Sequence, residues 1–295
     1  MKKAYLFPGQ GSQFKGMGKQ HYQFDGDFKK RCDQADEILG YRITEVMFEG
    51  DEESLTQTRY TQPALFLHGC ARFEMLGHRA DVVAGHSLGE YTALVAAGVL
   101  SFEDALATVQ KRAELMQKAG EESQGSMAAV IGLEESVVEQ ICDNLMKEEK
   151  GVVVPANYNA TGQVVISGDE ERVQAAVEKM KEAGAKMAKK LPVSGAFHSS
   201  LMKPAHEQLD LIIDKLSFHT PKAFVYSNYS GSGSDDPGVL KENLKRQMLN
   251  PVRWARTIQT MHQDGIRHFI ETGPGSVLQG LVKRTVKNVE ISGFQ

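Results

Sequence analysis

Short apolar runs alternate with helical patterns along the first part of the chain. Ala4–Phe7 is a run of apolar residues that ends in the turn sequence Pro8–Ser12, and Val82–Gly85 is a second such run, again ended by glycine. The pattern predicts buried strands at both runs. Residues 91–97 and 101–118 carry apolar residues at helical spacing. Strands that alternate with helices indicate a layered α/β domain.

The pattern changes in the middle of the chain, where strands and helices are predicted in the order βαββαβ. The predicted strands are 126–131, 152–157, 163–167 and 186–191, and the predicted helices are 134–147 and 169–183. This order is the split βαβ arrangement of a ferredoxin-like domain.

Two glycine- or proline-bearing segments, 119–125 and 191–195, flank this unit and are typical of crossings between domains. We therefore predict a small subdomain, 125–193, inserted into a larger one made of 1–124 and 194–295. Residues 230–238 are predicted to form a polar, mobile loop. Residues 266–271, followed by a glycine turn, repeat the strand-then-turn pattern and indicate that the chain returns to the first sheet.

Composition and charge narrow the class of protein. Of the 295 residues, 41% are hydrophobic and 24% are charged, and the formal net charge is −4. This balance is typical of a globular protein, lacks the basic footprint of a nucleic-acid binder, and includes no apolar run that approaches a membrane span. The three cysteines, Cys32, Cys70 and Cys142, are widely spaced and form no CxxC pair. We expect free thiols in a reducing compartment, and hence a cytoplasmic protein.

Gly85-His-Ser-Leu-Gly89 matches the G-x-S-x-G pattern of a nucleophile elbow. In such an elbow the serine occupies a strained turn between a strand and a helix, so its neighbours must be small. The amide after the serine can then donate a hydrogen bond to a developing oxyanion. The apolar run before Gly85 and the helical pattern after it supply this context. A glycine-flanked turn whose serine merely caps a helix would give the same pattern.

A serine nucleophile needs a base, and the chain has nine histidines. His198 lies in a turn of small residues just after the predicted insert, whereas His86 adjoins the serine and should point away from it. His206 and His219 lie in helical or polar contexts. Position alone does not single out His198.

No acid between serine and histidine completes a triad convincingly. Asp104, Asp143 and Asp169 all fall at expected helix starts or helix surfaces. A Ser–His dyad, with the imidazole oriented by a backbone carbonyl, is the more economical interpretation.

Arg112 falls on the apolar stripe of the predicted helix 101–118, together with Ala105, Val109 and Met116. A buried guanidinium must be paired or keep its head in water. Periodicity alone favours an internal salt bridge or a snorkelling side chain over a clamp for a substrate carboxylate. No HExxH motif or Cys/His cluster predicts a metal site.

Taken together, the motifs resemble those of the malonyl-coenzyme A:acyl carrier protein transacylase family, and the resemblance spans nearly the whole chain. The matching segments are Phe7–Gln13, Thr61–Ala64, Gly85–Glu90, Gly195–Ser199, Asn250–Trp254 and Glu271–Gly275. The resemblance implies an α/β fold in which an α/β-hydrolase-like large subdomain carries an inserted ferredoxin-like small subdomain.

The resemblance also implies roles for individual residues. Ser87 matches the acylated serine and His198 its general base. Gln10 falls at an oxyanion-hole position, alongside the amide of Leu88. Gln247 matches the residue whose carbonyl orients the histidine.

Two further residues are implied to bind the substrate. Arg112 matches the arginine that pairs with the carboxylate of the extender unit, which reverses the interpretation from periodicity. Phe197 and Leu88 resemble the residues of malonyl-selective members and would crowd an α-methyl branch.

The implied reaction moves a malonyl group from malonyl-coenzyme A to Ser87, and then to a phosphopantetheinylated acyl carrier protein, with no tightly bound cofactor. Residues 39–41 and 58–63 look more like those of discrete, trans-acting transferases of polyketide synthases than those of the fatty-acid enzymes. Two alternatives stay open: a hydrolase that clears stalled acyl carrier proteins, and a non-catalytic docking subunit of a synthase complex.

Overall fold

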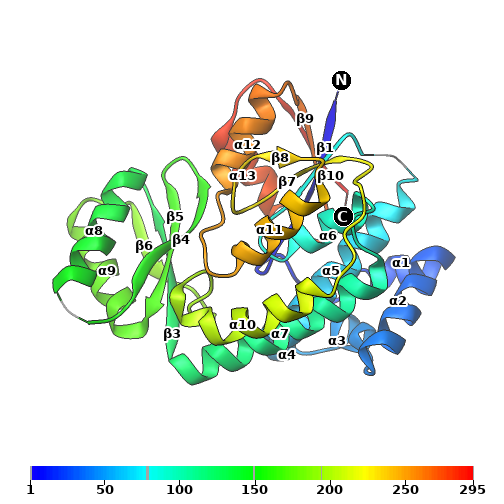
Figure 1. The fold of residues 1–295 in the computed structure, drawn as a ribbon, viewed down its shortest axis with the longest axis horizontal. Helices are drawn as coiled ribbons and strands as arrows, with labels where there is room; N and C mark the ends of the chain where they lie inside the picture. Colours follow the sequence, from blue (N-terminus) through cyan, green and yellow to red (C-terminus); the bar gives the residue numbers. More distant parts are fainter. Residues whose placement is uncertain (1, 78–79, 149, 194, 295) are drawn as a thin grey trace.

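The computed structural model describes residues 2–77, 80–148, 150–193 and 195–294, and within them the strands form two separate sheets (Figure 1). Residues 1, 194 and 295, at which the predicted subdomains begin or end, lie outside the described residues. The strand order of the larger sheet is β10-β9-β1-β2-β7-β8. Its strands are β1 (Lys3–Phe7), β2 (Val82–Gly85), β7 (Phe224–Tyr226), β8 (Gly233–Ser234), β9 (His268–Thr272) and β10 (Glu290–Phe294).

The neighbouring central strands β1 and β2 are buried over almost their whole length, which explains why they are short continuous apolar runs rather than alternating ones. On β1, Tyr5 and Phe7 pack into one core, while Ala4 and Leu6 pack into another on the opposite face. Neighbouring strands pair in parallel except β7 and β8, which are antiparallel.

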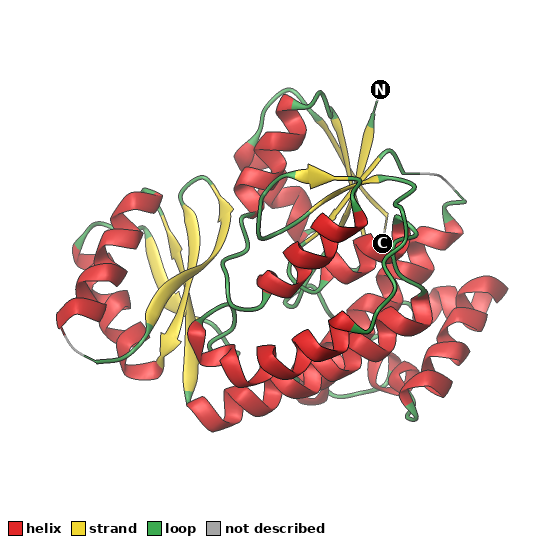
Figure 2. Cartoon of the chain, viewed as in Figure 1, coloured by secondary structure: helices red, strands yellow, loops and turns green. Residues whose placement is uncertain are grey.

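Helices cover both faces of this sheet (Figure 2). The helices that contribute to the Tyr5 and Phe7 core are α1 (Lys19–Phe24), α2 (Gly26–Leu39), α3 (Ile43–Phe48), α4 (Glu52–Thr56), α5 (Thr58–Met75), α6 (Gly89–Ala96), α7 (Phe102–Ser123), α10 (Lys203–Asp214) and α11 (Pro237–Gln247). The helices on the Ala4 and Leu6 face are α12 (Trp254–Gln263) and α13 (Val277–Thr285). A short 3₁₀ helix, Ser200–Met202, precedes α10.

The smaller sheet is antiparallel, with strand order β4-β5-β3-β6. Its elements are β3 (Gly125–Ile131), α8 (Glu135–Glu148), β4 (Val153–Ala160), β5 (Gln163–Asp169), α9 (Glu170–Glu182) and β6 (Met187–Lys190). Ala128 and Val130 pack under α8 and α9, whereas Met127 and Val165 on the other face join the core of the larger part. The predicted α/β class with a ferredoxin-like order of elements is confirmed.

One helix end and one loop differ from the prediction. The helix predicted at 101–118 continues to Ser123, with Ala119 and Gly120 buried in its packed face, and the crossing between subdomains in segment 119–125 stays a prediction. The polar loop expected at 230–238 contains β8, and Asp236 accepts a hydrogen bond from the amide of Val239 as the N-cap of α11. The exact subdomain boundaries stay a prediction.

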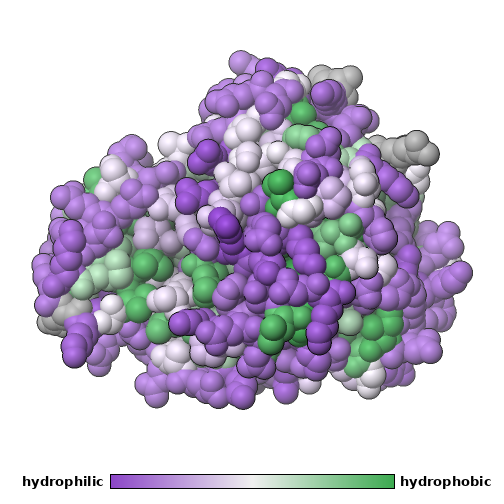
Figure 3. All heavy atoms as spheres, in the orientation of Figure 1, coloured by the Kyte–Doolittle hydropathy of each residue, from purple (hydrophilic) through white to green (hydrophobic). Residues whose placement is uncertain are grey.

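The face of the molecule in Figure 3 is mostly hydrophilic, with apolar side chains scattered among polar ones. In the segments that the structure describes, no helix combines the length and the apolar character needed to cross a membrane.

Candidate active site

Ser87 lies in the tight turn between β2 and α6, with φ of 50° in the left-handed region. The flanking glycines are required by close packing. A Cβ atom at Gly85 would lie 1.8 Å from the carbonyl carbon of Gly89, and one at Gly89 would lie 2.1 Å from the carbonyl oxygen of Phe7. The backbone has the geometry of a nucleophile elbow, in which strain projects the serine toward a cavity.

The structure brings His198 to this serine. Its Nε2 lies 2.8 Å from Ser87 Oγ, and its Nδ1 lies 3.0 Å from the carbonyl oxygen of Gln247 and 3.2 Å from that of Asn250. Because a carbonyl can only accept, Nδ1 carries the proton and Nε2 is free to accept from the serine hydroxyl. The arrangement is a dyad oriented by backbone carbonyls.

The three aspartates considered as a third member have other partners or positions. The amide of Asp104 donates a hydrogen bond to Ser101 Oγ at the start of α7, and the Asp169 carboxylate accepts one from the amide of Val152. Asp143 lies on α8. His86 also points away from the serine, because its Nε2 lies 2.7 Å from Asn159 Oδ1 and its ring packs on Trp254.

Burial, and after it repulsion from the nearby Arg112 guanidinium, lower the pKa of His198 to about 3. Hydrogen bonds to the Gln247 and Asn250 carbonyls act in the opposite direction, because they favour the protonated ring, but they are the weaker influence. His198 is therefore the neutral, proton-accepting form at physiological pH.

Arg112 is 1% exposed and lies beside the nucleophile. Its Nη1 donates to Gln62 Oε1 at 2.6 Å, and its Nη2 donates to Ser87 Oγ and Gln247 Oε1, each at 3.1 Å. Its Nε has no hydrogen-bond partner among the described residues. No carboxylate is hydrogen-bonded to the guanidinium in the described part of the chain, so the internal salt bridge that periodicity favoured is not what the structure shows.

Leu88 and Gln10, the two candidate oxyanion-hole residues, both line the cavity onto which Ser87 opens. Leu88 precedes the first residue of α6, and amides at such a position have no carbonyl partner within the helix. The side chain of Gln10, in the turn after β1, donates to Thr58 Oγ1 at 3.4 Å and lines the same cavity as Ser87. The positive end of α6 thus points at the place where charge would develop on a thioester oxygen.

Three residues of the site were not identified from the sequence: Gln62, Glu90 and Asn228. Asn228 follows β7; its Oδ1 accepts from the Ser87 amide and its Nδ2 donates to the carbonyl of Gly85, each at 2.6 Å. Glu90 Oε2 accepts from Gln247 Nε2 at 2.6 Å. A usable signal was present, because Glu90 is the sole charged residue in the apolar segment 89–96 and Gln62 is a polar residue in an otherwise apolar run of α5.

A cavity of about 170 Å³ opens onto these groups. The larger part lines it with Ser87, His198 and Arg112, and the smaller sheet lines it with Asn157, Asn159 and two apolar residues, Met127 and Val165. Phe197, 6% exposed, also lines it. The cavity therefore lies between the two sheets, with the nucleophile on one wall and both amide and apolar side chains of the smaller sheet on the other.

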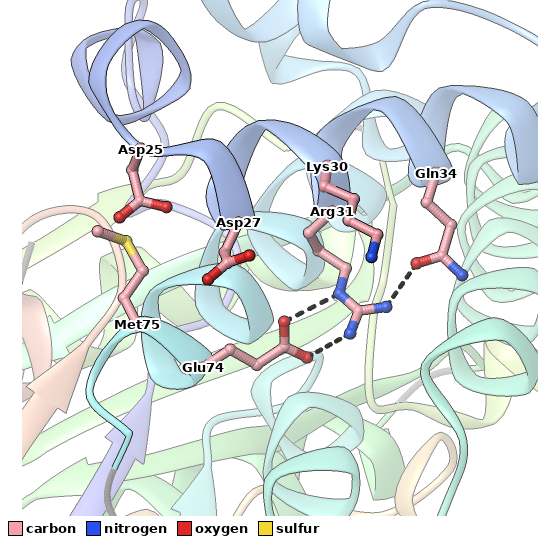
Figure 4. A pocket seen from close by; sticks show the side chains of 7 residues that line it. All are labelled: Asp25, Asp27, Lys30, Arg31, Gln34, Glu74 and Met75. Atoms are coloured by element: carbon pink, nitrogen blue, oxygen red, sulfur yellow. Dashed lines mark hydrogen bonds and ion pairs between the residues drawn. The ribbon is translucent and has the colours of Figure 1, made fainter.

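A wider hollow of about 650 Å³ lies elsewhere, along α2 and the end of α5 (Figure 4). Arg31 is paired there with Glu74 and with Gln34. It contains none of the predicted site residues. Among the described residues, no group of His, Cys, Asp or Glu side chains is arranged to hold a metal ion.

Comparisons with known proteins agree over the whole length of the chain. The model of the acyl transferase domain family matches residues 4–293. The malonyl CoA-acyl carrier protein transacylase of Bacillus subtilis is 46% identical over 297 residues, which cover 99% of this chain and 93% of that protein.

Solved structures give the same result. The malonyl CoA-acyl carrier protein transacylase of Coxiella burnetii superposes with a TM-score of 0.95 at 41% identity, covering 100% of this chain and 94% of that one. A malonyl-transacylase in complex with its type II PKS acyl-carrier protein superposes with a TM-score of 0.94 at 37% identity, covering 99% of this chain and 95% of that one.

Proposed function

Because the chain belongs to the acyl transferase family, we propose that it is a malonyl-coenzyme A:acyl carrier protein malonyltransferase that works through a malonyl ester of Ser87. One observation carries the assignment of this site. A neutral imidazole nitrogen and a buried guanidinium both lie within hydrogen-bond distance of Ser87 Oγ. The first can remove the hydroxyl proton, and the second can hold the free carboxylate of a short dicarboxylic acyl group.

In the first half-reaction, Ser87 Oγ attacks the thioester carbonyl while His198 Nε2 takes its proton. The Leu88 amide and Gln10 receive the oxyanion. When the tetrahedral intermediate collapses, the carbon–sulfur bond breaks and His198 returns the proton to the departing coenzyme A thiolate. The malonyl group stays on Ser87 as an ester, with its carboxylate on Arg112.

In the second half-reaction, the phosphopantetheine thiol of the carrier protein takes the place of coenzyme A. His198 accepts the thiol proton, the sulfur attacks the ester carbonyl, and the ester bond to Ser87 breaks. The proton then passes from His198 to Ser87 Oγ. The cycle regenerates the starting enzyme, needs no tightly bound cofactor, and is of the ping-pong type.

Selection among acyl groups follows from Arg112 and Phe197. An acetyl group would leave the buried guanidinium without a carboxylate, which makes it a poor substrate. The buried ring of Phe197 restricts the room beside the acyl α-carbon, so we expect methylmalonyl to be disfavoured.

We propose a cytoplasmic location, supported by three buried cysteines that are free thiols. The carrier protein is the partner, and no nucleic acid or membrane takes part in the reaction. Service to a polyketide synthase rather than to fatty acid synthesis stays a prediction from residues 39–41 and 58–63.

A transfer assay tests the function. Malonyl-coenzyme A labelled in the malonyl group is incubated with the enzyme and with holo acyl carrier protein, and the apo carrier, which lacks the thiol, is the matched control. We expect label on the holo carrier alone. Steady release of free malonate, with no labelled carrier, would identify the chain as a hydrolase instead. No turnover with either carrier would favour the docking subunit.

A further inference from the structure

Glu90 is a buried carboxylate that the proposed mechanism does not use. It lies in the first turn of α6, three residues after the nucleophile, and is 1% exposed. Its Oε2 accepts two hydrogen bonds, from Gln247 Nε2 at 2.6 Å and from the amide of Asn228 at 3.2 Å. Burying an ionisable side chain costs free energy unless hydrogen bonds compensate for the lost hydration. The two donors on Oε2 supply such compensation, so Glu90 is an integral part of the hydrogen-bond network of the site.

Both donor residues also contact the catalytic dyad: Gln247 contacts His198, and Asn228 contacts Ser87. Gln247 Nε2 also donates to the carbonyl of Ser87 at 2.9 Å, and the backbone carbonyl of Gln247 receives His198 Nδ1 at 3.0 Å. Gln247 Oε1 receives Arg112 Nη2 at 3.1 Å. The side chain of Gln247 is thus fixed by three groups of the site, while its backbone fixes the base.

Asn228, the second donor, holds the backbone of the nucleophile elbow. Asn228 bridges the elbow, since it accepts from the Ser87 amide and donates to the Gly85 carbonyl. Ser87 is held at φ of 50°, a conformation that persists only where surrounding contacts enforce it. The backbone of Asn228 is tied to Glu90 by the hydrogen bond to Oε2.

We propose that Glu90 is a positioning residue, which holds Gln247 and Asn228 together and so sets the distance between Ser87 Oγ and His198 Nε2. This inference rests on the proposed function, because it assigns Glu90 to the same transfer. Glu90 is not among the residues that line the catalytic cavity.

To hold Gln247 and Asn228 together, the side chain at position 90 must supply an oxygen that accepts hydrogen bonds, but it need not carry a negative charge. Burial is the largest influence and raises the pKa of Glu90 to about 7, against the opposing effects of hydrogen bonds with Gln247, Asn228 and Ser227 and of the nearby Arg112. Both donors bind Oε2, so they are retained when Oε1 carries a proton. For the same reason, an amide oxygen in the position of Oε2 can replace the carboxylate.

Glu271 provides a matched control. It is also 1% exposed, its pKa is also raised by burial, and it accepts hydrogen bonds from the amides of Leu278 and Gln279 at the start of α13. None of these partners lines the catalytic cavity. Replacing Glu271 therefore reproduces the loss of a buried carboxylate without touching the dyad.

The experiment compares Glu90→Ala, Glu90→Gln, Glu271→Ala and the unaltered enzyme in malonyl transfer, with rates divided by the folded fraction from circular dichroism. For Glu90→Ala we expect kcat to fall about a hundred-fold, the size of effect that a misplacement of about 1 Å can produce, while KM for malonyl-coenzyme A changes little. Glu90→Gln should restore most of kcat. Glu271→Ala should lose stability but keep kcat.

A double substitution tests the route through Gln247. If Glu90 acts by holding Gln247, the losses in Glu90→Ala and Gln247→Ala are strongly non-additive in the double variant. Full kcat in folded Glu90→Ala, or losses that simply add, would overturn the positioning role. Equal losses in Glu90→Gln and Glu90→Ala would overturn the acceptor explanation. Absence of transfer by the unaltered enzyme would instead refute the proposed function.

Discussion

The hydroxyl of Ser87 has two neighbours that act on different parts of it. His198 Nε2 is placed to take the proton, and Arg112 Nη2 donates to the oxygen itself. The guanidinium also disfavours a charged imidazole nearby. The cation that is proposed to bind the acyl carboxylate therefore also keeps the base in its neutral form.

The pH dependence of acylation follows from this arrangement. The pKa of His198 is lowered to about 3, so the ring is deprotonated, and active as a base, at every pH above that value. The rate of malonyl-Ser87 formation, measured by rapid quench and mass spectrometry, should show no acid limb from this histidine between about pH 5 and 8.

The Arg112→Ala variant is the control for that measurement. Arg112 is, after burial, the largest cause that lowers the pKa of His198, so the acid limb should move to higher pH when the cation is removed. An acid limb near the ordinary histidine pKa in the unaltered enzyme would contradict the account.

Arg112→Ala should also change the choice of acyl group. Loss of a buried, hydrogen-bonded partner for the malonyl carboxylate should cost about 2–5 kcal/mol in kcat/KM for malonyl-coenzyme A. The low rate with acetyl-coenzyme A should fall much less, or rise. Steady-state kinetics with the two thioesters measure the ratio, and an undiminished preference for malonyl would show that the carboxylate binds elsewhere.

Phe197 should set the limit on branching at the α-carbon. Shortening it in Phe197→Leu should raise the methylmalonyl to malonyl ratio of kcat/KM about ten-fold or more, because room for one methyl group is worth about 1–3 kcal/mol. Competition between the two thioesters, read by mass spectrometry of the loaded carrier, gives the ratio directly. Equal rates for both in the unaltered enzyme would refute the selectivity.

Among individual residues, those that lie within a recognisable motif could be predicted from the sequence. Ser87 follows from the elbow pattern, whereas His198 and the role of Arg112 required resemblance to a family. The hydrogen-bond partners of Gln62 and Asn228 could not be predicted, because each lies 50 or more positions away in the sequence. Local patterns carry no information about such pairings.

Among the elements, the β2–α6 connection is the one on which the site depends. A methyl group at Gly85 would overlap the carbonyl carbon of Gly89, which is backbone and cannot turn aside. Gly85→Ala should therefore destabilise the protein by about 4 kcal/mol or more, or prevent folding.

Gly280 offers the contrasting case within the same chain. It lies exposed in α13, and a Cβ atom there would meet nothing within 4 Å. Gly280→Ala should stabilise the protein by about 0.5–1 kcal/mol, because alanine loses less conformational entropy in a helix. Urea denaturation of both variants measures the difference, and a tolerated Gly85→Ala would contradict the packing of the elbow.

Elements with strong local signals were predicted well, and those defined by tertiary packing were not. The six elements of the smaller unit appear in the predicted order with ends shifted by a few residues. In contrast, the last turn of α7 depends on the burial of Ala119 and Gly120, and a Cβ atom at Gly195 would lie 3.1 Å from the Cα atom of Gly120. Strand β8 has two residues, too few to leave a pattern.

In the whole molecule, the site exists because two sheets built from separate stretches of chain face each other. The smaller sheet contacts the larger part through a bridge between Asn157 and Val252 and through the hydrogen bond that His86 Nε2 donates to Asn159 Oδ1. The sequence indicated an inserted unit, but not that its strands would line the catalytic cavity. That arrangement depends on contacts between segments more than 70 residues apart.

The central claim is that Ser87 carries the acyl group. Intact-protein mass spectrometry after mixing with malonyl-coenzyme A tests it most directly, with Ser87→Ala as the control and peptide mapping to locate the adduct. We predict a single malonyl adduct on the peptide that contains Ser87, absent from the variant and discharged by holo acyl carrier protein. An adduct that persists in Ser87→Ala, or transfer to the carrier by that variant at the normal rate, would contradict the account.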